Sequence, residues 1–306
     1  MNAIKRVPVP ACGVMLGLAA LGNLLQSYSE GLRWACGMAA AVLLALILLK
    51  LILFPKAVGE DLKNPIMAST AAAFPMGLML LSVYVKPFLG GGAFAIWGLA
   101  VLLHVVLILY FSARFLVKLS LSKVFASWYI VYVGIVAAAV SAPAYGQQAL
   151  GMAAFWFGFV CLLCLLVLVT VRYAKLPVPE PAKPLICIYT APASLCVAGY
   201  LQSAETKSLP LLLGMFALAC VLYVFSLVKA AACLRLPFYP SYAAFTFPFV
   251  ISAIAAKQTA ACLANMGHPV PALQYVVLAE TVIAAALTVY AFVRFLGTIF
   301  GKNANG

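Results

Sequence analysis

The sequence contains little charge, and this scarcity excludes the soluble protein classes. Charged residues make up 8% of its 306 residues and only six of them are acidic, whereas a soluble globular domain has roughly 25% charged residues. Hydrophobic residues make up 67% of the chain. This composition predicts an integral membrane protein, with a single transmembrane domain over residues 1–306.

Recognisable enzyme motifs are also missing. The sequence has no HExxH, no GxSxG and no glycine-rich phosphate-binding loop, and six acids leave little material for paired-carboxylate chemistry. Cys161 and Cys164 have CxxC spacing, but no second pair and no nearby histidine accompanies them. We interpret them as small packing residues. The sequence therefore predicts no enzyme activity, no cofactor and no metal site.

What the chain has in abundance is long apolar runs. These runs show no alternation of polar and apolar residues, so they predict membrane-spanning helices and not the strands of a barrel. The charged residues divide the chain into about ten such spans. The expected spans are 7–25, 32–54, 66–85, 93–117, 123–142, 150–171, 185–201, 209–235, 239–264 and 273–300.

The distribution of basic residues predicts the orientation. Of the 19 lysines and arginines, four (Arg33, Lys86, Lys207 and Lys257) fall on one side of the membrane in this segmentation, which leaves 15 on the other. Basic residues are enriched in cytoplasmic loops. Both termini are therefore predicted to be cytoplasmic, in a multi-pass protein of the cytoplasmic membrane. The basic residues flank spans singly, so the net charge of +13 does not predict a nucleic-acid partner.

Odd-numbered and even-numbered spans differ in composition. Even spans are rich in branched and bulky residues, whereas odd spans are rich in glycine, alanine and proline, with Pro10, Pro75, Pro192 and Pro248 in four of them. Small residues allow helices to approach closely, and prolines are tolerated in spans that are buried in protein or line a cavity. Two structures fit this pattern: five kinked inner helices around an ion path, or a tightly packed core of small residues.

Several stretches resemble one known family. They are "VPVPACGVMLGLAALGN" in the first span, "AAFPMG" in the third, "APASLCVAGYL" in the seventh and "AAFTFPFVISAIAAKQ" in the ninth. The chain resembles the tellurite-resistance/dicarboxylate transporter family, which includes TehA-type proteins and the slow anion channels of plant guard cells. The resemblance implies an all-α fold of five helical hairpins, with inner helices around a pore and outer helices facing lipid. It also implies a homotrimer that takes small anions as partners, and a phenylalanine that blocks the pore, which is Phe247 here.

One departure from the family pattern concerns the fifth span. The sequence has Val131 where the family would have a proline in the middle of the helix, and Pro143 only at the outer end. The resemblance therefore leaves open whether this helix bends.

Helical geometry gives an independent prediction for the ninth span. At 100° per residue, Phe247 lies about 160° to 200° from both Phe245 and Phe249, so the three rings cannot all point inward. If Phe247 faces a pore, we expect the other two rings to pack against neighbouring helices. A packed core position is the alternative for Phe247.

The same geometry extends the predicted pore face beyond Phe247. Ile251, Ile254 and Gln258 continue its stripe within about 40°. Lys257 lies off this stripe and about 15 Å further along the axis, near the outer end of the span. Two interpretations of Lys257 stay open: a side chain that snorkels to the membrane surface, or a positive charge that attracts anions to an outer vestibule.

Two further ionisable residues fall inside spans, His104 in the fourth and Glu280 in the tenth. Such residues are functional candidates, and either could relay a proton. Both are on even spans, which favours structural hydrogen bonds between helices. We therefore expect channel-like permeation of small inorganic or organic anions. The alternative is a proton-coupled transporter for C4-dicarboxylates, or one for tellurite or sulfite.

Overall fold

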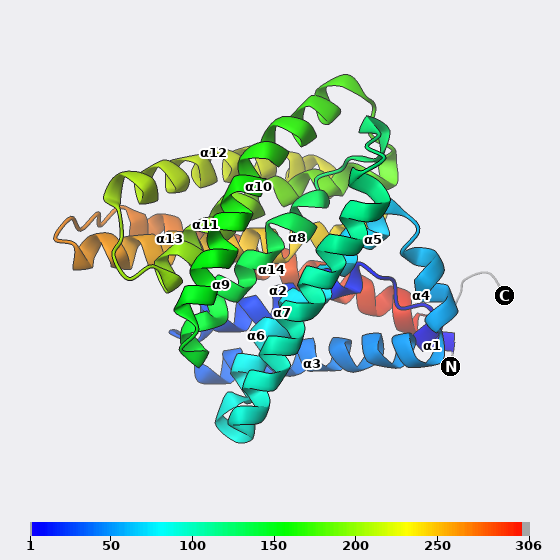
Figure 1. The fold of residues 1–306 in the computed structure, drawn as a ribbon, viewed down its shortest axis with the longest axis horizontal. Helices are drawn as coiled ribbons and strands as arrows, with labels where there is room; N and C mark the ends of the chain where they lie inside the picture. The colour runs from blue at the N-terminus through cyan, green and yellow to red at the C-terminus, as the bar shows by residue number, and fades with distance from the viewer. Residues whose placement is uncertain (1, 302–306) are drawn as a thin grey trace.

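The computed structural model describes residues 2–301 and is all-helical over that range (Figure 1). Eight helical segments of the described chain are long and apolar enough to cross a membrane. They are Glu30–Leu53, Pro65–Leu89, Gly91–Leu116, Gln148–Lys175, Glu180–Ser203, Leu209–Cys233, Pro240–Asn265 and Leu273–Phe300. Two shorter apolar helices, Ala11–Leu25 and Gly134–Tyr145, lie in the predicted first and fifth spans. The protein is therefore a multi-pass membrane protein, and the count of ten spans stays a prediction.

Five long helices present broad apolar surfaces. They are α3 (Glu30–Leu53), α7 (Gly91–Phe111), α10 (Gln148–Lys175), α12 (Leu209–Cys233) and α14 (Leu273–Phe300). Between 22% and 33% of the residues in their most apolar windows are buried. Exposed apolar surface of this extent is favourable in contact with lipid and unfavourable in contact with water.

Other segments are both more buried and interrupted. The segment α5 (Pro65–Ala71) and α6 (Ala73–Leu89) is 67% buried in its most apolar window. In two more, a 3-10 helix precedes the α-helix: η5 (Glu180–Tyr189) before α11 (Thr190–Ser203), and η6 (Pro240–Phe245) before α13 (Phe247–Asn265). Their windows are 94% and 61% buried. Small side chains permit this close packing.

The four predicted kink prolines all lie at these interruptions or at a helix start. Pro10 immediately precedes α2 (Ala11–Leu25), Pro75 and Pro192 are in the first turns of α6 and α11, and Pro248 is the second residue of α13. A proline in the first turn costs little, because its missing N–H would have no partner there. The prolines thus begin helices after a break, whereas the sequence suggested bends within continuous helices.

The fifth segment is broken although it lacks a central proline. It consists of α8 (Trp128–Tyr132), η3 (Gly134–Val136), α9 (Ala137–Ser141) and η4 (Ala142–Tyr145). The break therefore has a cause other than proline, which is described with the site below.

Five segments contact one another in a closed order: the four broken ones and α2, which begins after Pro10; these five are called the interrupted segments below. α2 packs on α6, α6 on α9, α9 on α11, α11 on α13, and α13 returns to α2. Each also packs on the long helix that follows it in the chain, as α2 does on α3 and α13 on α14 (Figure 1). A cavity enclosed by these segments is therefore lined by residues that lie far apart in the sequence.

The two ends of the described chain lie together. Nη1 of Arg6 donates to the carbonyl of Gly301 at 2.9 Å, and α1 (Asn2–Lys5) contacts α14 (Figure 1). Ends on the same face fit an even number of crossings. Two short helices, α4 (Pro55–Asp61) and η2 (Leu121–Lys123), lie in connecting segments, and the π-helix η1 (Ser112–Leu116) continues α7.

Candidate functional site

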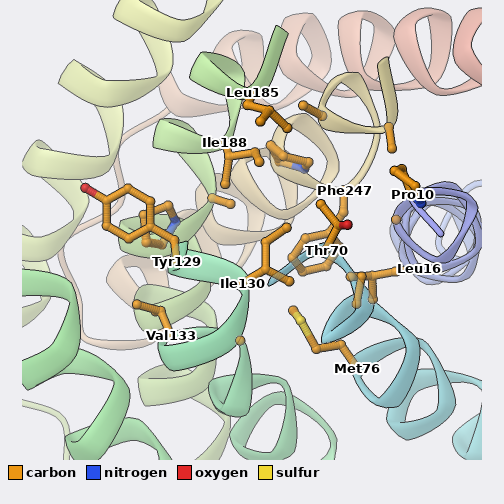
Figure 2. A pocket seen from close by; sticks show the side chains of 18 of the residues that line it. Pro10, Leu16, Thr70, Met76, Tyr129, Ile130, Val133, Leu185, Ile188 and Phe247 are labelled. Atoms are coloured by element: carbon orange, nitrogen blue, oxygen red, sulfur yellow. The ribbon is translucent and has the colours of Figure 1, made fainter. Parts of the chain in front are cut away.

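A narrow cavity of about 50 Å³ lies among the interrupted segments, and all five of them contribute to its lining. Figure 2 shows Phe247 near Ile130 and Leu16, with Tyr129 on the far side. No charged residue lines this narrow cavity in the described part of the chain; the polar side chains are Thr70, Tyr129 and Ser241. An ion that enters it must therefore exchange its water for a mostly apolar wall and for backbone dipoles.

A second, wide cavity has a volume of about 510 Å³. Its lining includes all four residues predicted from the ninth span: Ile251, Ile254, Lys257 and Gln258. It also includes several polar side chains from other segments, namely Asn23, Gln26, Arg33, Ser141 and Gln202. The predicted face of α13 is therefore directed toward one cavity, and a role of these residues in permeation stays a prediction.

Phe247 belongs to the lining of both cavities, and Leu195 of α11 is the other residue that they share. Phe247 is 6% exposed and is the first residue of α13. Its ring lies between a small, apolar space and a large, partly polar one. A side chain in this position can separate the two spaces or, by moving, connect them.

The backbone around Phe247 is held by α2. Thr246 interrupts the helix, and its Oγ1 donates to the carbonyls of Ala243 (2.7 Å) and Gly13 (3.0 Å). Gly17 lies one turn beyond Gly13 on α2, and a Cβ there would be 2.5 Å from the Thr246 Cβ. Two glycines four residues apart thus let α2 approach the break closely.

The neighbouring phenylalanines pack elsewhere. Phe249 is fully buried and meets the Tyr223 ring of α12 edge-on at 5.9 Å, and Phe245 lies 4.8 Å from the Tyr242 ring. Neither lines the narrow or the wide cavity. The angular prediction assumed one continuous helix and therefore does not apply to Phe245, which precedes the break at Thr246.

Lys257 holds the end of α2. Its Nζ donates to the carbonyl of Leu24 at 3.3 Å and to Oγ of Ser27, and it lies 5.4 Å from the centre of the Tyr28 ring. A cation at a helix C-terminus interacts favourably with the carbonyl end of the helix dipole. Lys257 therefore has a structural contact as well as a place at the wide cavity.

His104 explains how the fifth segment breaks without a proline. The His104 ring is fully buried, and its Nε2 donates to the carbonyl of Val131 at 2.9 Å. A Cβ on Gly134 would lie 2.6 Å from Sδ of Met76 and 3.0 Å from Cε1 of His104. The absent side chain at Gly134 thus makes room for His104, whose ring bonds a backbone carbonyl just before the break.

We expect His104→Leu to lower the free energy of unfolding by about 1–3 kcal/mol, because the buried Val131 carbonyl loses its donor. Thermal unfolding in detergent measures this change. His268, exposed in the loop before α14, offers a matched control, and His268→Leu should leave the unfolding temperature unchanged. Equal unfolding temperatures for the two variants would contradict the structural role of His104.

Glu280 lies on α14 and is only 5% exposed. Its Oε2 is buried and has no hydrogen-bond partner among residues 2–301. Neither Glu280 nor His104 lines the narrow or the wide cavity. The structure therefore does not bring these two predicted ionisable candidates together with Phe247.

Most lining residues of the two cavities were not predicted from the sequence, and Leu195 and Arg33 are the most informative of them. Leu195 gives no signal, because it is one leucine within an apolar helix. Arg33 did give one: it is one of the four basic residues on the side of the membrane that carries few of them, and it lines the wide cavity.

Residues 6–296 match the model of a family described as voltage-dependent anion channel (SLAC1), which confirms the resemblance seen in the sequence. No curated protein matches the chain in a sequence comparison. Since the family model covers nearly the whole chain, this protein belongs to the SLAC1 family of voltage-dependent anion channels.

Proposed function

We propose that this protein conducts small inorganic or organic anions through the space enclosed by the interrupted segments, and that the Phe247 ring is the gate. The observation that carries the proposal is the place of Phe247 in the lining of both cavities. A ring that fills an apolar constriction excludes water and ions together, so the path conducts only when the ring moves.

The proposed path follows from a ten-span layout. The interrupted segments would be the inner helices of five hairpins, and the long helices would face lipid. The packing of each interrupted segment on the long helix that follows it supports this layout. The homotrimer implied by the resemblance is part of the proposal, with one path in each subunit.

The preference for anions would come from helix starts and not from a ring of arginines. Pro10, Ala73, Ala191 and Phe247 mark the beginnings of α2, α6, α11 and α13, and all four line the narrow cavity. A helix N-terminus carries roughly half a positive elementary charge. Several such ends around one apolar space favour an anion over a cation.

The positions of His104 and Glu280 favour a channel over a proton-coupled carrier. Coupling requires a group that exchanges protons within the path, and neither residue lines either cavity. A dianion gains or loses about 4.6 kcal/mol per 100 mV, twice the value for one charge. A passive path in an inside-negative cell would therefore mainly release anions.

Flux measurements at clamped voltage separate the two mechanisms. We expect chloride, nitrate and malate to cross liposomes that contain the protein at rates set by voltage and concentration alone. An imposed pH gradient should leave these rates unchanged. Malate accumulation against its electrochemical gradient, seen only with a proton gradient, would establish the carrier instead.

A further inference from the structure

The wide cavity carries two charged residues in the described part of the chain, and both are cations: Arg33 from α3 and Lys257 from α13. No acidic side chain lines this cavity within residues 2–301. The lining also offers amide groups, from Asn23, Gln202 and others. The balance of charge at its wall is therefore positive.

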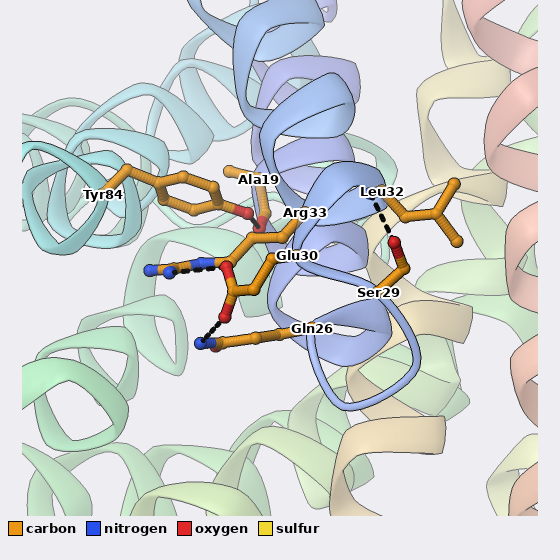
Figure 3. Close-up of polar contacts among 7 residues, drawn as sticks. All are labelled: Ala19, Gln26, Ser29, Glu30, Leu32, Arg33 and Tyr84. Carbon is orange, nitrogen blue, oxygen red and sulfur yellow. Dashed lines mark hydrogen bonds and ion pairs between the residues drawn. The ribbon is translucent and has the colours of Figure 1, made fainter.

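Arg33 is held in place at this wall. Its side chain is 14% exposed, and its guanidinium carbon lies 4.8 Å from the centre of the Tyr84 ring and 5.6 Å from that of Trp34. The Tyr84 hydroxyl donates to the carbonyl of Ala19 at 2.7 Å, which fixes the ring (Figure 3). A guanidinium stacked on a fixed ring loses little further freedom when it binds an anion.

The hydrogen bonds of Arg33 are incomplete. Its Nη1 contacts a carboxylate oxygen of Glu30 at 3.5 Å, and its buried Nε has no partner among residues 2–301. A guanidinium has five N–H donors, and it often binds a carboxylate or a phosphate through two parallel hydrogen bonds. The Nη2 of Arg33 is neither buried nor hydrogen-bonded to another residue of the described chain, so Arg33 keeps donors available for an anion in the cavity.

Glu30 is the group that such an anion would compete with. Its side chain is 59% exposed, and it also accepts a hydrogen bond from Gln26 at 2.7 Å (Figure 3). Exposed ion pairs of this kind are weak. An anion from solution can therefore displace the Glu30 carboxylate from Arg33 at a small cost in free energy.

We propose that Arg33 and Lys257 make the wide cavity a binding site for small anions, and that Glu30 weakens this site as a tethered competitor for Arg33. The proposal rests on the proposed function, since the bound anions are those that pass Phe247. For anions that enter from the side of Lys257, the site lies before the constriction and raises their local concentration, as charged clefts do.

Conductance of variants at two salt concentrations tests the proposal. All variants are made in the Phe247→Ala background, so that an open path is present, and chloride conductance is measured in symmetric solutions. At about 10 mM salt, where the Debye length is about 30 Å, Arg33→Gln and Lys257→Gln should each lower conductance by about twofold or more. At about 1 M, where that length is about 3 Å, the differences should largely vanish.

Three further variants separate charge from structural damage. Glu30→Gln leaves Arg33 in place and should raise conductance at low salt, a direction that loss of folding cannot produce. Arg33→Lys keeps the charge and should retain most of the conductance. Lys86→Gln removes a cation predicted for the same side of the membrane that lies outside the lining of the wide cavity, and it should lower conductance less than Arg33→Gln does.

The outcomes distinguish this proposal from the function on which it rests. Absence of anion current in the Phe247→Ala background would remove the proposed function and the anion site with it. A current that is present but indifferent to Arg33→Gln and Glu30→Gln at low salt would overturn the anion site alone. If Arg33→Gln does not fold, the sign of the Glu30→Gln effect decides.

Discussion

Phe247→Ala is expected to raise anion conductance by at least about tenfold, which corresponds to a barrier lowered by about 1.4 kcal/mol. The physical reason is steric. The ring lies between the narrow and the wide cavity, and its removal joins them into one space that water can enter. Voltage-clamp recording of chloride current in bilayers that contain the purified variant measures the change.

Phe249→Ala provides a matched control for this prediction. Phe249 is on the same helix and fully buried, but it packs on Tyr223 and lines neither cavity. Its truncation should cost about 3–5 kcal/mol of stability, as for other buried phenylalanines, without opening the path. A folded Phe247→Ala protein that conducts no better than the wild type would exclude Phe247 as the gate.

Gly17→Val is expected to destabilise the protein strongly. A Cβ at this position would lie 2.5 Å from the Thr246 Cβ and 2.8 Å from the backbone nitrogen of Phe247. A backbone atom cannot rotate away as a flexible side chain can, so α2 must shift. We expect a loss of about 3 kcal/mol, at the upper end of the cost of overpacking, measured by thermal unfolding in detergent.

Gly98→Val tests whether this loss comes from the contact or from valine in a helix. Gly98 lies within α7, and a Cβ there would meet nothing within 4 Å. The intrinsic helix propensities of valine and glycine differ by only a few tenths of a kcal/mol, so this variant should unfold at the wild-type temperature. An equal decrease in both variants would show that close packing of α2 on Thr246 is not the cause.

Local properties of the sequence predicted the membrane class and several of the site residues. Scarce charge and long apolar runs identify a multi-pass protein, because the cost of placing charge in lipid acts on each segment separately. The helical periodicity of α13 alone grouped Ile251, Ile254 and Gln258 with Phe247, and all of them line the wide cavity. The resemblance, and not the periodicity, selected Phe247 as the gate.

Other features of the site could not be predicted, because they depend on residues far apart in the chain. The break at Thr246 is held by Gly13, 233 residues away. The fifth segment breaks where His104, 27 residues before Val131, supplies the hydrogen bond. No local pattern contains either pairing.

The sequence by itself therefore determined that the chain spans a membrane and which segments are rich in small residues and proline. Only the tertiary structure decided that Phe247 and Leu195 line two cavities at once and that Arg33 lines the larger one. The reason is physical. Burial in lipid is a property of each segment's own composition, whereas a cavity exists only between segments that have already packed.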